Sequence, residues 1–318
     1  MSRGDLADSA TPADAGTWTA PSRHPNQLRT RLLRLVLLLA TVASTTYWGR
    51  EHYLGFLTTF SADPPAVGLL DGMWYSVAIL GILGVHELGH YYACRFYRID
   101  ASPPYFLPAP LLTGTVGAFI RIRQRIPTKA ILFDVGAAGP IAGFVVAVPV
   151  LFAGLRLSRV IPLPESDAGL YALGEPLLFK GAVWLIWGEI PDGHAITLHP
   201  VALAAWFGLL LTALNLFPVG QLDGGHISYA AFGPRSTAIT LAGIAVAVGL
   251  TFVSLSWIAW TVVLLMMLVI FGPHHPKTRD EHVPLDATRR CVALFTAVIF
   301  ILCFTPAPIE LIGTSVEP

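Results

Sequence analysis

Two histidines and a glutamate stand close together in the apolar stretch "ILGILGVHELGHYYACRF", residues 79–96. If this stretch is a helix, His86 and His90 lie on one face with about 6 Å of helical rise between them, so both rings can reach one metal ion. Glu87 lies beside them, where its carboxylate can accept a proton from a water molecule at that ion. The HExxH spacing is therefore typical of a catalytic metal site, and chance occurrence is a weak competitor.

A catalytic zinc ion takes three protein ligands and keeps one position open. The best candidate for the third ligand is Asp223 in "LNLFPVGQLDGGHISY", residues 214–229, because it follows Pro218, which ends a helix, and sits in a glycine-flanked turn. His226 and Asp134 are rivals for the same role. Sequence spacing excludes neither of them.

The surroundings of these residues are strongly apolar. The chain of 318 residues has a mean hydropathy of +0.63, and only 13% of it is charged, against about a quarter in soluble domains. This composition indicates a membrane protein with the lipid bilayer as its surroundings. Lys+Arg and Asp+Glu balance at 20 each, so nothing points to a nucleic-acid partner. The three cysteines lack a CxxC spacing, which argues against a disulfide framework or a thiolate zinc site.

Membrane-spanning helices need about 20 mostly apolar residues each. Seven segments fit this pattern and predict an all-α polytopic membrane protein: 32–49, 70–96, 130–155, 199–218, 237–254, 256–272 and 288–305. The shorter stretch 174–188 is predicted to be an interfacial helix. If the N-terminus is cytoplasmic, most of the 20 Lys and Arg residues lie on the cytoplasmic side of the membrane. The exceptions are Arg50, Arg156, Arg159 and Lys180. The positive-inside rule favours this orientation.

The chain divides into two parts by composition. Residues 1–30 are rich in Ser, Thr, Ala, Asp and Pro, and they are predicted to form a disordered cytoplasmic tail. Residues 31–318 are predicted to form one membrane-embedded domain, whose catalytic core covers about 70–230. Two histidines and a glutamate inside lipid cost several kcal/mol unless they are paired or coordinated, which again favours a metal ion.

Two segments are expected to shape the site. The Pro-rich "PPYFLPAP" (103–110) excludes a regular helix, and "TVGAFIRIR" (115–123) fits a strand, so we expect a re-entrant β-hairpin or loop near the metal. Its edge could pair with an unwound substrate, and the alternative is an interfacial loop that covers the site. Small residues in the third span are predicted to let it approach the metal helix: Gly136, Gly139, Gly143 and Ala147. Asp134 is expected to cap that span.

The motifs "HELGH" (86–90), "GAAGPIAG" (136–143) and "NLFPVGQLDGG" (215–225) together resemble the site-2 protease family of intramembrane zinc metalloproteases. The likeness runs continuously over about 70–230. It fits a bacterial-type member without a PDZ domain, because the 43 residues of 156–198 are too few for one.

The resemblance implies one Zn2+ per chain, held by His86, His90 and Asp223. It also implies that Glu87 is the catalytic acid and base, and that Asn215 helps to hold the substrate carbonyl or its oxyanion. The implied partner is a transmembrane protein or peptide substrate. The implied location is a multi-pass position in the bacterial cytoplasmic membrane.

Three classes of function compete on this pattern. The first is an intramembrane zinc endopeptidase that hydrolyses peptide bonds of membrane-spanning substrates. The alternative is a proton- or cation-coupled transporter that uses the His/Glu/Asp cluster, but a relay does not need a three-ligand geometry. A catalytically inactive scaffold is disfavoured because no expected catalytic position is replaced. His274 and His275 are expected to lie on the surface.

Overall fold

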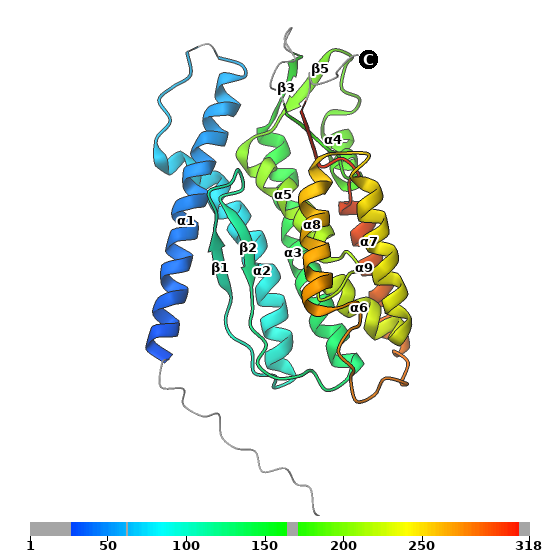
Figure 1. Cartoon of the computed structure of the whole chain (residues 1–318). Helices are drawn as coiled ribbons and strands as arrows, with labels where there is room; N and C mark the ends of the chain where they lie inside the picture. Colours follow the sequence, from blue (N-terminus) through cyan, green and yellow to red (C-terminus); the bar gives the residue numbers. More distant parts are fainter. Residues whose placement is uncertain (1–26, 62, 164–170, 312–318) are drawn as a thin grey trace, which may run out of the picture.

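The computed structural model describes residues 27–61, 63–163 and 171–311 (Figure 1). The prediction of a disordered tail falls mostly on residues 1–26, which lie outside the described residues. Helix α1 begins at Gln27, so residues 27–30, which were expected in the tail, are helical.

Each of the seven predicted segments holds a helix, because long apolar runs are a local signal. These helices are α1 (Gln27–Thr58), α2 (Met73–Phe96, after the 3-10 turn η1, Leu69–Gly72), α3 (Lys129–Leu157), α5 (Pro200–Asn215), α7 (Ser236–Leu250), α8 (Ser256–Phe271) and α9 (Ala287–Cys303). The predicted interfacial helix is α4 (Leu177–Trp187), and α6 (Asp223–Phe232) with the short turn η2 (Gly233–Arg235) precedes α7.

Four helical stretches are long and apolar enough to cross a membrane by length and composition. Within the described ranges these are Gln27–Thr58, Leu69–Phe96, Lys129–Leu157 and Asp223–Leu250. The chain is thus an integral membrane protein. The helices α5 and α8 are apolar but shorter.

The fold is mostly helical, but the all-α expectation needs correction because the structure contains three two-stranded antiparallel sheets. Their strands are β1 (Tyr105–Pro108) with β2 (Thr115–Phe119), β3 (Arg159–Pro162) with β5 (His194–Thr197), and β4 (Tyr171–Leu173) with β6 (Ile309–Leu311). The first pair is a hairpin in the segment where one was expected. Its register places Tyr105 opposite Phe119.

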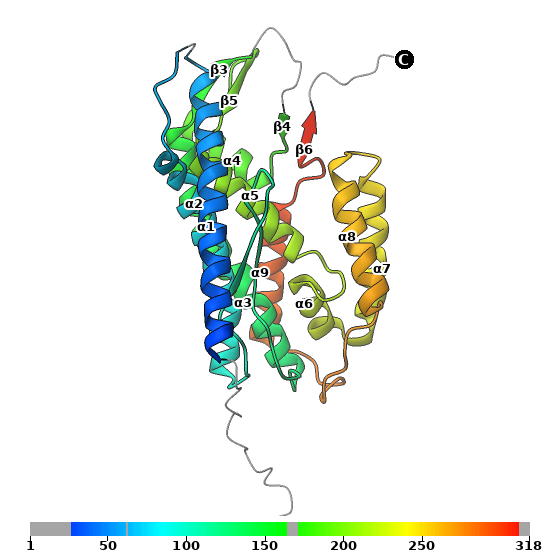
Figure 2. The same cartoon turned by 60° about the vertical axis from the view of Figure 1, so that its left-hand side comes forward.

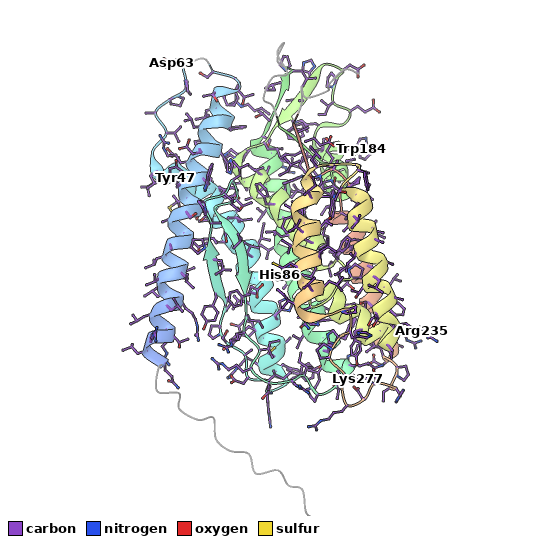
Figure 3. The ribbon with its side chains drawn as sticks, in the orientation of Figure 1. Tyr47, Asp63, His86, Trp184, Arg235 and Lys277 are labelled. Carbon is purple, nitrogen blue, oxygen red and sulfur yellow. The ribbon has the colours of Figure 1, made fainter. Side chains whose placement is uncertain are left out.

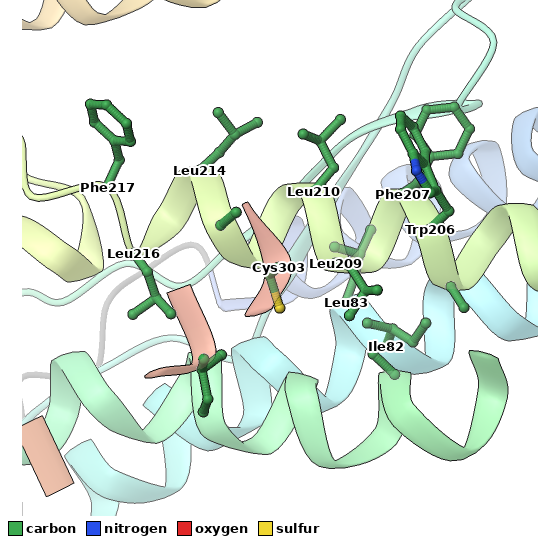
Figure 4. Close-up of a cluster of buried hydrophobic side chains, with 14 of the residues drawn as sticks. Ile82, Leu83, Trp206, Phe207, Leu209, Leu210, Leu214, Leu216, Phe217 and Cys303 are labelled. Atoms are coloured by element: carbon green, nitrogen blue, oxygen red, sulfur yellow. The ribbon is translucent and has the colours of Figure 1, made fainter. Parts of the chain in front are cut away.

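Helices α2, α3 and α5 form the centre of the molecule, with α1 and the hairpin on one side and the α7–α8 pair on the other (Figures 1 and 2). Small residues bring α2 and α3 together, because a Cβ atom at Gly89 would lie 2.5 Å from the Ala138 carbonyl oxygen. Figure 4 shows Leu209 and neighbouring α5 side chains near Ile82 and Leu83 of α2. These side chains are buried and belong to one hydrophobic core.

The turn of the hairpin is fastened to two helices. Ser44 of α1 donates a hydrogen bond to the Ala109 carbonyl oxygen at 2.9 Å, and Tyr75 of α2 donates one to the Thr113 carbonyl oxygen at 3.0 Å. Gly114 has φ +69 and packs directly on the Thr45 backbone, where a Cβ atom would clash. These contacts fix the height of β2 along α2.

Candidate metal and catalytic centre

Three candidate ligand atoms converge at one point. The Oδ2 atom of Asp223 lies 3.3 Å from Nε2 of His86 and 3.3 Å from Nε2 of His90. The two Nε2 atoms lie 3.2 Å from each other. His86 and His90 are buried, and Asp223 is nearly so. Among the described residues, these three form the one group of His, Cys, Asp or Glu with the spacing of a metal site.

The triangle of donor atoms fits a tetrahedral zinc ion. Zinc bonds of about 2.0–2.1 Å in a tetrahedral arrangement place neighbouring ligand atoms about 3.3 Å apart, which matches all three sides. Nδ1 of His90 lies 2.7 Å from the Val135 carbonyl oxygen. A bond to that carbonyl requires a proton on Nδ1, so Nε2 keeps its lone pair and can bind a metal ion.

The chain brings Asp223 to the histidines by a tight reversal after α5. Helix α5 ends at Asn215, and Asp223 begins α6. Gly224 and Gly225 pack so closely on the backbone of the intervening turn, at Leu216 and Gly220, that neither has room for a Cβ atom. The glycines after Asp223 are therefore what lets α6 start beside α2.

Glycines of α3 make room for the imidazole rings. A Cβ atom at Gly139 would overlap the His90 ring, and one at Gly143 would lie 3.0 Å from the Cβ atom of His86. A Cβ atom at Gly136 would lie 3.1 Å from the Cβ atom of His226. The prediction that small residues let α3 approach the HExxH helix is confirmed for Gly139 and Gly143, whereas Gly136 packs against α6.

Glu87 and Asn215 share a cavity with the three donor atoms. Glu87 is buried, with 8% of its surface exposed, and it follows His86 on α2. Nδ2 of Asn215 lies 3.3 Å from Nε2 of His86. The cavity has a volume of about 240 Å³. A water molecule or a peptide group entering it therefore meets a carboxylate, an amide and the ligand triangle together.

The hairpin and the α5–α6 turn form the walls of this cavity. Ala118, Phe119 and Ile120 contribute from β2 and the residue after it, while Gln221 and Leu222 contribute from the turn. Figure 3 places His86 near the middle of the bundle, between the ends marked by Asp63 and Lys277. The sequence reasoning missed Gln221, although its position two residues before Asp223 was an available signal.

The two rivals for the third ligand position have other partners. Nδ1 of His226 lies 2.8 Å from Nε2 of His275, whose ring stacks on Tyr229 at 4.3 Å. His275 was expected on the surface, but it is half-buried, and burial lowers the pKa of its ring below the usual value. A neutral ring suits this contact between two imidazoles. His226 lines the cavity but stays outside the donor triangle.

Asp134 joins three helices at one end of the bundle. Its carboxylate accepts two hydrogen bonds from Arg289 of α9, at 2.9 Å and 2.6 Å, and one from the hydroxyl of Tyr97 after α2. The prediction that Asp134 caps α3 is wrong, because the Thr128 side chain caps this helix by accepting from the Ile131 amide. No local pattern could have paired Asp134 with Arg289.

Comparison with known proteins agrees with this geometry. Residues 74–256 match the family described as Peptidase family M50. The chain is 32% identical over 252 residues to the probable zinc metalloprotease EGY2, chloroplastic, of Arabidopsis thaliana, covering 77% of this chain and 44% of that protein. It is 34% identical over 222 residues to EGY2 of Oryza sativa subsp. indica, covering 67% and 38%, and 31% identical over 234 residues to EGY1 of Arabidopsis thaliana, covering 67% and 42%.

The fold and the donor triangle define the site of a membrane-embedded metallopeptidase. The residues matched by the family include all three members of the donor triangle. The chain belongs to peptidase family M50, the site-2 protease family. The predicted resemblance is confirmed. The chain spans less than half the length of these relatives. Because the relatives are plant proteins, they do not support the prediction that the chain is a bacterial-type member of the family.

Proposed function

We propose that this chain is an intramembrane zinc endopeptidase that hydrolyses peptide bonds of membrane-spanning substrates. The observation that carries the proposal is the convergence of His86, His90 and Asp223, with Glu87 in the same cavity, in the middle of an apolar bundle. Membership of family M50 supports it, as do relatives named probable zinc metalloproteases.

The roles follow from the positions of the side chains. His86, His90 and Asp223 would hold one zinc ion, which would supply a Lewis acid to polarise the scissile carbonyl and to make water acidic enough to react near neutral pH. Glu87 accepts the proton of the attacking water on its carboxylate and passes it to the leaving amine nitrogen. Asn215 donates through Nδ2 to the carbonyl oxygen of the bound peptide.

The hairpin offers a partner for the substrate backbone. A helix in lipid must unwind before it is cut, and its released N–H and C=O groups then need new hydrogen bonds. Strand β2 pairs with β1 on one edge, and no second strand pairs with it among the described residues. We infer that the substrate adds as a strand to β2 beside Ala118 and Phe119, with the hairpin dipping into the bilayer as a re-entrant element.

The arrangement in the membrane is also part of the proposal. All seven predicted segments cross the bilayer, the shorter helices α5 and α8 included, and the N-terminus is cytoplasmic. Arg235 and Lys277 lie at the same end of the bundle (Figure 3), which suits the cytoplasmic side under the positive-inside rule. A location in the bacterial cytoplasmic membrane stays a prediction from the sequence.

The transporter alternative has less support. Proton or cation relays use chains of polar groups along a path, whereas here three ligand atoms converge at tetrahedral spacing. Family M50 membership also favours the peptidase.

The decisive experiment reconstitutes the purified full chain in lipid nanodiscs with a single-span peptide and analyses the products by mass spectrometry. Glu87→Gln keeps the shape of the cavity and should reduce cleavage at least about 100-fold, because proton transfer contributes roughly that much. Glu189→Gln, at an exposed glutamate, is the control and should cleave normally. Chelation and re-addition of zinc should abolish and restore cleavage. Equal cleavage by Glu87→Gln would remove Glu87 from the mechanism.

A further inference from the structure

A second hollow lies on the other side of α6 from the metal centre. It is a groove of about 510 Å³ between α6 and α9, and it shares no lining residue with the catalytic cavity. Ile227 and Phe232 line it from α6, and Ala293, Leu294 and Phe300 line it from α9. Phe232 and Leu294 are largely exposed, so the groove opens sideways toward lipid.

A positively charged side chain, that of Arg290, lies at one end of this groove. Arg290 lines it from the first turn of α9 and is exposed. The neighbouring Arg289 is bound to Asp134 and Asp286, but the guanidinium of Arg290 has no hydrogen bond or ion pair with any residue in the described part of the chain. A positive group therefore remains available at the mouth of an apolar groove.

The length of the groove matches one leaflet of a bilayer. Phe300 lies ten positions after Arg290 on α9, which corresponds to about 15 Å of helix. The hydrocarbon core of a membrane is about 30 Å thick, so the groove runs from the level of the headgroups to about the bilayer centre.

We propose that this groove binds one acyl chain of an anionic phospholipid, with the lipid phosphate at Arg290. The apolar walls suit a hydrocarbon chain, and the unpaired guanidinium suits a negatively charged headgroup.

The bound acyl chain would support α6, the helix that begins at Asp223. Gly224 lines the groove, and the preceding residue, Asp223, belongs to the donor triangle. The acyl chain would pack against Ile227 and Phe232 of α6. The groove thus gives the catalytic helix an apolar backing on its lipid side.

The test measures lipid retention by native mass spectrometry on the full chain, with phosphatidylglycerol and phosphatidylcholine of identical acyl chains as probes. One arginine near a membrane surface contributes about 1 kcal/mol, so the wild type should prefer phosphatidylglycerol about five-fold. Arg290→Gln should remove this preference. Arg235→Gln is the matched control, since Arg235 lies at the same end of the bundle but does not line the groove, and it should keep the preference.

A second variant tests the acyl chain itself. Ala297 lines the groove and is exposed, so Ala297→Phe fills the groove without entering the core. It should reduce retention of both lipids several-fold. An unchanged preference in Arg290→Gln, an equal loss in Arg235→Gln, or full retention in a folded Ala297→Phe protein would each overturn the proposal. The measurement does not depend on proteolysis, so it stands apart from the proposed function.

Discussion

The Oδ2 atom of Asp223 lies 3.3 Å from Nε2 of His90, although the two residues come from helices α6 and α2. The contact exists because the turn after α5 reverses the chain and Gly224 and Gly225 let α6 start against that turn. The donor triangle therefore depends on the tertiary packing of two helices, and not on the HExxH helix alone.

The first prediction concerns which residues retain zinc. Asp223→Asn should lower zinc affinity on the order of 100-fold or more, because changes even outside the ligands cost 10–100-fold. His226→Asn should keep zinc, since His226 contacts His275 and is outside the donor triangle. Metal analysis of the purified proteins, at equal folded fraction, checks both. Loss of zinc in His226→Asn with retention in Asp223→Asn would reverse the assignment.

The second prediction concerns the glycine against the His90 ring. Gly139→Ala adds a methyl group where the ring now lies, so α2 and α3 must move apart. We expect a loss of about 1–3 kcal/mol in stability, as for other overpacked cores, together with lower zinc content. Gly81→Ala is the control, because a Cβ atom there meets nothing within 4 Å. It should be neutral or stabilise by up to about 1 kcal/mol. Thermal unfolding and metal analysis measure both variants, and equal behaviour of the two would contradict this packing argument.

The third prediction concerns the junction of Asp134 and Arg289. Both side chains are about a quarter exposed, at 25% and 27%, so the pair lies between a surface and a buried ion pair. Arg289→Leu should cost about 1–3 kcal/mol, between the usual ranges for exposed and buried pairs. Arg289→Lys should recover only part of it, because lysine cannot make the two-pronged contact.

A double-mutant cycle with Asp134→Asn measures this coupling by thermal unfolding. Arg235→Leu, at an exposed arginine, is the control for loss of charge and should change stability by less than about 0.5 kcal/mol. Additive effects of the two changes in the cycle would show that the pair contributes nothing.

The sequence predicted what is encoded locally. Apolar run length located a helix in each of the seven predicted segments, and the four-residue spacing of His86 and His90 placed both rings on one face. The Pro-rich segment followed by β-branched residues located the β1–β2 hairpin. Each of these depends on neighbours within one element, where period and composition are informative.

What could not be predicted is non-local. A loop was expected at "DGGH" because these residues have the composition of a turn, but helix α6 begins there. The two glycines are needed because they pack closely on the preceding turn. Sequence spacing left Asp223, His226 and Asp134 as candidates for the third donor, and only the folded structure shows that Asp223 converges with the two histidines. Strands β4 and β6 pair across most of the second half of the chain, and their few residues carry no signal that identifies a partner.

The last prediction concerns pH and the segment after α8. His275 anchors residues 272–286 to α6 through His226 and Tyr229, and burial lowers the pKa of its ring. Because the pKa is lower in the folded protein than its ordinary value of 6.5, this anchor contributes its full stability above about pH 6.5 and loses it as the pH falls. Hydrogen exchange of amides 276–283, corrected for intrinsic rates, should therefore accelerate between pH 7.5 and 5.5. His275→Phe keeps the ring stacked on Tyr229 but cannot titrate, so its exchange should show no such change. His274→Gln, at the exposed neighbour, should behave like the wild type. A pH response that persists in His275→Phe would place the sensitive group elsewhere.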